Sequence, residues 1–137
     1  MNDTVILDSN AIIALLDGNK AVARMLENVQ QVLVPAIVCG EIDAGAQGDT
    51  KREKATREAF VAFLEMEQVA VLPVMRKTGE FYARVFSFLK SAGTPIPTND
   101  IWIAAATLEV GGILFTRDRH FLNIPMFDTI GLEDASS

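Results

Sequence analysis

Short apolar segments alternate along this sequence with longer segments in which apolar residues recur at helical spacing. β-Branched and apolar runs predict buried strands, and a period near 3.6 residues predicts helices. Parallel strands need a crossover between them, usually a helix. We therefore expect an α/β fold, a three-layer α/β/α sandwich with a mainly parallel central sheet. The expected strands are 4–8, 31–34, 69–74 and 113–116, with 126–129 as a weaker edge strand; the expected helices are 9–17, 20–28, 35–46, one after Thr50, 76–92 and 99–110.

Residues with strong boundary preferences mark several helix ends. Thr50 and Glu53 form a capping-box pattern. Pro35 is expected at the first position of a helix, where its missing N–H has no cost. Thr98 is expected to cap the helix that follows it. Asn99 is open between a capping role and a place in a functional site, and we favour capping.

The size of the chain limits its organisation. A length of 137 residues suits one domain, residues 1–137, because two would each be too small to bury a good core. Cys39 is the single cysteine, which excludes an internal disulfide and fits a reducing compartment.

The first apolar stretch is broken by acids and follows no basic segment, so we expect no signal peptide. Apolar runs such as 11–16 are too short to cross a bilayer, and a cytoplasmic location without membrane contact is expected.

The net charge of −6 is weak evidence against a nucleic-acid partner, because phosphate binding usually appears as a basic patch. Two bound divalent cations would cancel four of these charges and change the sign of the local field. The charge is therefore no evidence against a metal site.

Four acids from distant parts of the sequence are expected at one edge of the sheet. Ligands of such sheets bind beyond the carboxyl ends of the strands. Asp8 ends the first strand, and Asp118 follows the 113–116 strand by two residues. Glu41 lies early in the helix after the second strand, and Asp100 lies in the first turn of the helix before the 113–116 strand. Both helix starts should lie at the same edge.

Clustered carboxylates raise one another's pKa values and cost stability unless a cation neutralises them. Oxygen donors suit Mg²⁺ or Mn²⁺, and such an ion can activate water at a phosphodiester. No histidine or thiol set could hold zinc, since His120 and Cys39 are the only candidates. Each acid also has a purely structural interpretation. Asp8 and Asp118 could be turn residues, Asp100 could complement a helix dipole, and Glu41 is one of two acids on its helix, with Asp43.

Four segments in order resemble the PIN-domain family, and within it the VapC-type toxins of toxin–antitoxin pairs. Val5 to Asn10 resembles the opening strand with its first acid. Val38 to Ala46 is similar to the family's E-x-x-x-G-A helix. Ile96 to Asp100, followed by Ile103-Ala104-Ala105, resembles its D-x-x-I-A-A segment, and Thr116 to Phe121 resembles its T-x-D-x-x-F segment. Together these segments span nearly the whole chain.

The resemblance implies a PIN-like endoribonuclease that depends on Mg²⁺ or Mn²⁺ and cuts RNA. It implies a polar helper role for Asn10 and for the hydroxyl of Thr116, which join the catalytic set. It also implies a homodimer and a small cognate antitoxin as partner. The metal ligands would be Asp8, Glu41, Asp100 and Asp118.

Three other functions are compatible with part of this pattern. One is an RNA-processing nuclease of the same fold outside a toxin–antitoxin pair. Another is a non-catalytic interaction domain on the same scaffold, which the presence of all four acids disfavours. The third is a phosphatase of the haloacid-dehalogenase type, which needs a second Asp where this chain has Asn10.

Basic residues suggest where substrate phosphates could bind. Arg117 and Arg119 flank Asp118. Lys51 and Arg52 belong to a basic cluster that is either a phosphate contact or a solvated helix face. We do not expect His120 to act as a general base, because a metal-bound water needs none.

The aromatic residues are expected to serve packing. Phe121 is expected to anchor the core. The aromatic group at 81–88 should lie in the core or at a dimer face rather than stack on RNA. Trp102 stays open between a packed and an interfacial position.

Overall fold

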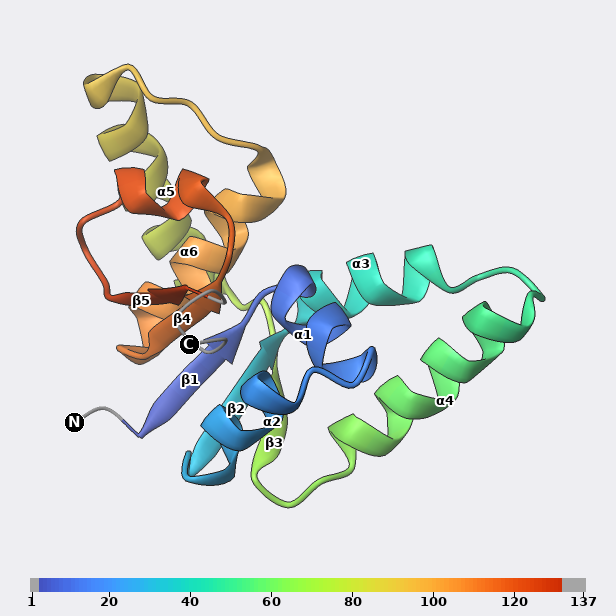
Figure 1. Ribbon diagram of the computed structural model, residues 1–137. Helices are drawn as coiled ribbons and strands as arrows, with labels where there is room; N and C mark the ends of the chain where they lie inside the picture. Colours follow the sequence, from blue (N-terminus) through green and yellow to red (C-terminus); the bar gives the residue numbers. More distant parts are fainter. Residues whose placement is uncertain (1–2, 132–137) are drawn as a thin grey trace.

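The computed structural model describes residues 3–131, which form a five-stranded, wholly parallel sheet between layers of helices (Figure 1). The strand order is β3-β2-β1-β4-β5, so the chain moves outward from β1 in one direction and then returns to the other side of it. The fold class expected from the sequence is confirmed. The strands are β1 (Thr4–Leu7), β2 (Gln31–Pro35), β3 (Val69–Leu72), β4 (Ile113–Thr116) and β5 (Thr129–Gly131).

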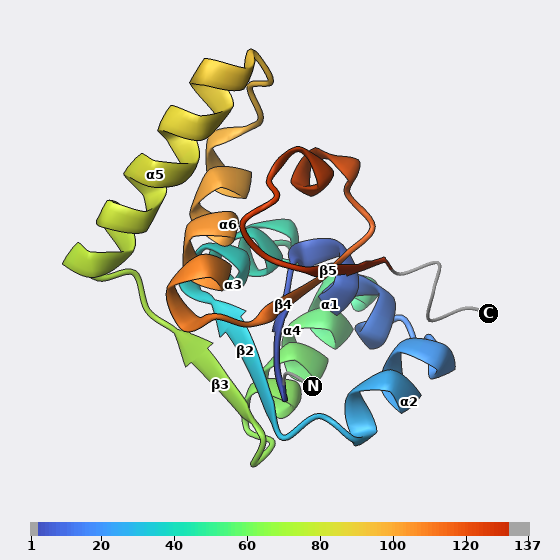
Figure 2. The same cartoon turned by 90° about the vertical axis from the view of Figure 1, so that its left-hand side faces the viewer.

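Helices cover both faces of this sheet. Figures 1 and 2 show α5 and α6 on one side and α1, α2 and α4 on the other. In residues 3–131, no helix is both long and apolar enough to cross a membrane. The helices are α1 (Ser9–Leu16), α2 (Lys20–Glu27), α3 (Ala36–Gly45), α4 (Lys51–Leu64), α5 (Arg76–Ala92) and α6 (Thr98–Val110), with a 3-10 helix η1 (Arg119–Asn123) after β4.

The central strand β1 lies deep in the core. It pairs with β2 on one side and β4 on the other, so Val5 lies opposite both Val32 and Ile113. Ile6 and Leu7 have no exposed surface, which means that both faces of the strand are covered. This explains why the strand reads as a continuous apolar run rather than as an alternating pattern. The position of Asp8, the residue after β1, is therefore fixed by the core.

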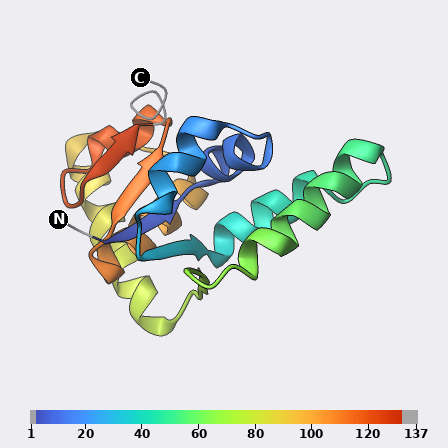
Figure 3. The same ribbon diagram turned by 60° about the horizontal axis from the view of Figure 1, so that its bottom comes forward.

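Helices α3 and α4 project from the sheet and are joined at their far ends by a loop (Figures 1 and 3). The loop between them is held by its own contacts. The Arg57 guanidinium donates hydrogen bonds to the carbonyls of Ala46 and Gly48. Glu53 accepts from the Gly48 N–H at 2.7 Å and from the Thr50 hydroxyl at 2.7 Å. The capping box predicted for this helix is present.

The structure corrects three expected boundaries. The last strand is Thr129–Gly131 rather than 126–129, because the preceding apolar residues pack against the core from a loop. Pro35 ends β2, opposite Leu72, instead of opening α3. Pro97, with an extended backbone, occupies the capping position of α6; Thr98 is already helical, and no side chain caps this helix.

The aromatic residues divide between core and surface. Phe121 is 1 % exposed and serves as the expected core anchor. Trp102 packs on Tyr82 with a ring-centroid distance of 4.3 Å and is half-buried. Phe86 and Phe88 are exposed on α5, so they are not core residues.

Gly112 offers a test of the packing around β1. A Cβ at this position would overlap the buried Ile6 side chain and lie 3.1 Å from the Thr4 carbonyl oxygen. Overpacking of this kind costs about 1–3 kcal/mol. We expect Gly112→Ala to lower the free energy of unfolding by that amount, measured by urea denaturation.

Gly40 is the matched control. An added Cβ there meets nothing within 4 Å, and because Gly40 lies in a helix, Gly40→Ala should raise the free energy of unfolding by about 0.5–1 kcal/mol. Equal stability of the two variants would contradict this packing.

Candidate active site

Asp8 lies where β1 ends and α1 begins, and both of its carboxylate oxygens are engaged. Its backbone is extended, with φ −85° and ψ 178°, so it serves as the N-cap of α1. Oδ1 accepts from the Ala11 N–H at 2.9 Å, and Oδ2 accepts a hydrogen bond from the Thr116 hydroxyl. The residue is only 4 % exposed. The carboxylate therefore has one orientation.

Thr116 and Asp118 hold the end of the neighbouring strand β4 against Asp8. The Thr116 hydroxyl accepts from the Asp118 N–H at 2.9 Å while it donates to Asp8. Asp118 in turn is the N-cap of η1, and its Oδ1 accepts from the His120 N–H at 2.9 Å. β1 and β4 are the two strands at which the sheet order reverses. Such a switch point is where open α/β sheets bind ligands.

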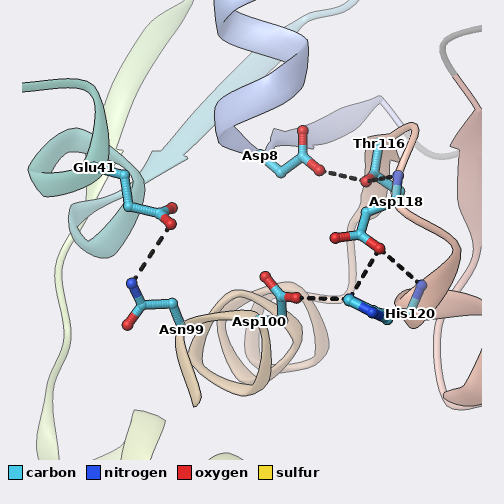
Figure 4. Close-up of polar contacts among 7 residues, drawn as sticks. All are labelled: Asp8, Glu41, Asn99, Asp100, Thr116, Asp118 and His120. Atoms are coloured by element: carbon cyan, nitrogen blue, oxygen red, sulfur yellow. Dashed lines mark hydrogen bonds and ion pairs between the residues drawn. The ribbon is translucent and has the colours of Figure 1, made fainter. Parts of the chain in front are cut away.

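Glu41 and Asp100 approach the same space from the helices α3 and α6. Glu41 accepts from the Ser9 hydroxyl at 2.6 Å and from the Asn99 amide at 3.5 Å. Asp100 lies in the first turn of α6, and its side chain is 16 % exposed. Figure 4 shows the carboxylates of Asp8, Glu41, Asp100 and Asp118 facing one shared space.

His120 connects two of these acids. Its Nδ1 lies 3.0 Å from Asp118 Oδ1 and 3.2 Å from Asp100 Oδ2 (Figure 4). A continuous chain of polar contacts thus runs from Asp8 through Thr116, Asp118 and His120 to Asp100, while Glu41 is held separately by Ser9 and Asn99.

Burial and mutual repulsion make this cluster costly when no cation is bound. Burial raises the pKa of Asp8 from 3.8 to about 6, and the nearby Asp118 and Asp100 carboxylates add to the rise, although the hydrogen bonds from Thr116 and Ala11 oppose it. Burial also raises the pKa of Asp100, with further contributions from Asp118 and Glu41, against the lowering effect of His120. A divalent cation would remove this repulsion, and oxygen donors that face one space fit such an ion.

The structure brings together Asp8, Glu41, Asp100, Asp118 and Thr116, as the sequence predicts; their roles in binding and catalysis stay predictions. Two neighbours, Ser9 and His120, were not assigned to the site from the sequence. The preference for Asn99 as a capping residue was wrong. Pro97 already holds the capping position, and the Asn99 amide is free to reach Glu41.

The other predicted residues lie outside this network. Asn10 is exposed on α1, and within residues 3–131 it makes no hydrogen bond to the four acids. Arg117 and Arg119 are exposed beside Asp118 and line a hollow of about 270 Å³. Lys51 and Arg52 open α4, and Arg52 lies 3.6 Å from Asp17, the C-cap residue of α1. Asp8 is at the opposite end of α1 from Asp17. The structure therefore does not bring Lys51 and Arg52 close to the four acids of the cluster.

Four carboxylates face one space at the switch point of a parallel sheet. The chain is therefore an α/β protein with an acidic site whose donors suit a cation. Comparison with known proteins then gives the family. The family model of the PIN domain matches residues 5–125, which is most of the chain. The chain belongs to the PIN-domain family.

Individual relatives agree with this assignment. The chain is 30 % identical over 117 residues to a protein named Ribonuclease VapC1 from Haemophilus influenzae strain R2866, covering 82 % of this chain and 84 % of that protein. It is similar to the structure of VapBC-1 from nontypeable Haemophilus influenzae, with a TM-score of 0.80, 26 % identity, and coverage of 95 % of this chain and 98 % of that one. The fold is also that of VapBC-5 from Mycobacterium tuberculosis, described as a member of the VapBC family of toxin–antitoxin systems, with a TM-score of 0.73, 22 % identity, and coverage of 94 % and 98 %.

The raised pKa of Asp8 predicts how stability depends on pH. Between pH 3.8 and about 6 the folded protein keeps a proton that the unfolded chain has released. The folded state therefore binds more protons, and the free energy of unfolding of the metal-free protein falls as pH rises through this range. Over this pH range, we expect the free energy of unfolding of the unsubstituted protein to fall by about 2–3 kcal/mol relative to that of Asp8→Asn. The amide in this variant does not bind the proton.

Urea denaturation in chelator at pH 4 and pH 7 measures this difference. The exposed Asp128 supplies the control, and Asp128→Asn should follow the unsubstituted protein at both pH values. The prediction would be contradicted if the free energy of unfolding changed by the same amount between pH 4 and pH 7 in the unsubstituted protein and in Asp8→Asn.

Proposed function

We propose that this chain is an endoribonuclease that requires Mg²⁺ or Mn²⁺ and acts in the cytoplasm as the toxin of a type II toxin–antitoxin pair. The observation that carries the proposal is the convergence of four carboxylates on one space at the switch point of the sheet. Membership of the PIN-domain family and the similarity to Ribonuclease VapC1 support RNA as the substrate. The similarity to VapBC-1 supports an antitoxin partner.

The proposed ion would be held by Asp8, Glu41, Asp100 and Asp118. When bound, it would supply Lewis-acid activation of water and stabilise charge on the phosphate. The protein's own contribution is orientation. The Thr116 hydroxyl donates to Asp8 and accepts from Asp118, which fixes the two strand-end acids relative to each other.

The opposite acid, Glu41, is oriented by side chains from two other helices. Ser9 from α1 and Asn99 from α6 both donate to it, so its carboxylate is held facing the other three acids. The exposed guanidinium groups of Arg117 and Arg119 stand next to Asp118 and are suited to contact the phosphates of the substrate. A homodimer is part of the proposal, with the exposed Phe86 and Phe88 of α5 as candidate contacts.

Two substitutions test the catalytic proposal. Asp8→Asn and Asp100→Asn each remove a carboxylate from the cluster while keeping its shape. Since a metal ion contributes several kcal/mol to such a reaction, we expect cleavage of RNA oligonucleotides with Mg²⁺ or Mn²⁺ to fall by about 10³-fold or more. Chelator should stop the unsubstituted enzyme.

The control is Asp43→Asn, an exposed acid two residues from Glu41 on the same helix. It should cleave at the unsubstituted rate. Full activity of both Asp8→Asn and Asp100→Asn would refute the proposal. Binding of neither Mg²⁺ nor Mn²⁺ in calorimetry would favour a non-catalytic domain on this scaffold.

The toxin assignment has a separate test in cells. Induced expression of the chain in a bacterium should arrest growth, and expression of Asp8→Asn should not, because arrest would depend on cleavage. Co-expression of the protein encoded next to this chain's gene should restore growth. RNA cleavage in vitro without arrest in cells would instead assign the chain to RNA processing outside a toxin–antitoxin pair.

A further inference from the structure

The only histidine of the chain points its Nδ1 into the acidic cluster. His120 comes from η1, just after β4, and its side chain is half-exposed. Nδ1 lies 3.0 Å from Asp118 Oδ1 and 3.2 Å from Asp100 Oδ2. One ligand atom from each of these three residues lies within 4.8 Å of the other two.

We propose that His120 Nδ1 is a direct ligand of the bound cation, together with Asp100 and Asp118, and that the site therefore prefers Mn²⁺ to Mg²⁺. The inference rests on the proposed function, which supplies the cation. It adds a nitrogen donor to a site whose other donors are carboxylate oxygens.

The distances fit shared coordination. In an octahedral site with bonds of about 2.1 Å, adjacent ligand atoms are about 3.0 Å apart. The two separations between Nδ1 and the carboxylate oxygens have this value within 0.2 Å. The imidazole thus stands where an adjacent ligand of the same ion would stand.

The histidine is also held in this position. Its backbone N–H donates to Asp118 Oδ1 at 2.9 Å, which fixes the turn between the two residues. Phe121, the next residue, is 1 % exposed and anchors η1 in the core. The backbone at His120 therefore has little conformational freedom left to lose when a cation binds.

The donor type determines the choice of ion. Mg²⁺ favours oxygen ligands and retains its waters, whereas imidazole binds first-row transition metals well. Replacement of one oxygen or water by a ring nitrogen thus costs Mg²⁺ more than Mn²⁺. A competing arrangement exists: the imidazole could simply donate hydrogen bonds to the two carboxylates and be displaced when the cation binds.

Electron–nuclear spectroscopy of bound Mn²⁺ separates these arrangements. Full-length, tag-free protein is labelled with ¹⁵N-histidine, so that His120 is the only labelled residue. We expect a ¹⁵N hyperfine coupling typical of direct coordination in the Mn²⁺ complex. It should disappear in His120→Gln and remain in Asn123→Ala, an exposed neighbour on the same 3-10 helix.

Affinities give the second measurement. Titrations of His120→Gln with each ion should show the dissociation constant for Mn²⁺ rising by about tenfold or more, and that for Mg²⁺ by less than about threefold. Bound Mn²⁺ without ¹⁵N coupling, or equal losses for the two ions, would overturn the inference and leave the proposed nuclease intact. No Mn²⁺ binding by the unsubstituted protein would overturn both.

Discussion

The hydrogen bond from the Thr116 hydroxyl to Asp8 joins two strand ends that are 108 residues apart in the sequence. It connects two of the four acids of the site. It fixes one carboxylate at the end of β1, and through the Asp118 N–H it fixes a second at the end of β4. These strands flank the switch point of the sheet, so one hydroxyl aligns the acids at the ends of two buried strands.

The acidic cluster lowers the stability of the folded protein when no cation is bound. A buried carboxylate with other acids around it disfavours the folded state at neutral pH, which is why the pKa of Asp8 rises. The apolar strands around β1 offset that cost, because Ile6, Leu7 and Phe115 are fully enclosed. Binding of a cation and stability are therefore linked: an ion that binds only the folded state also stabilises it.

The sequence predicted the sheet and the meeting of the four acids because both follow from connectivity. Apolar strands ending at Asp8 and Thr116, with helices between them, leave few other arrangements. It did not predict the contacts of Ser9 and His120, because these depend on side-chain directions in the turns after β1 and β4. It also missed that Lys51 and Arg52 lie toward the far end of α1, since the angle at which α4 packs is not encoded in local pattern.

The loop between α3 and α4 is held independently of the acidic cluster. Arg57 and Glu53 hold it through contacts that begin and end within the hairpin itself. Glu41, the nearest acid of the cluster, is secured instead by Ser9 and Asn99 at the base of the projection. A substitution at the tip of the loop therefore leaves the hydrogen bonds that orient Glu41 in place. The loop contacts and the contacts that hold Glu41 thus share no residue, so the end of this projection and the acidic cluster are structurally independent of each other.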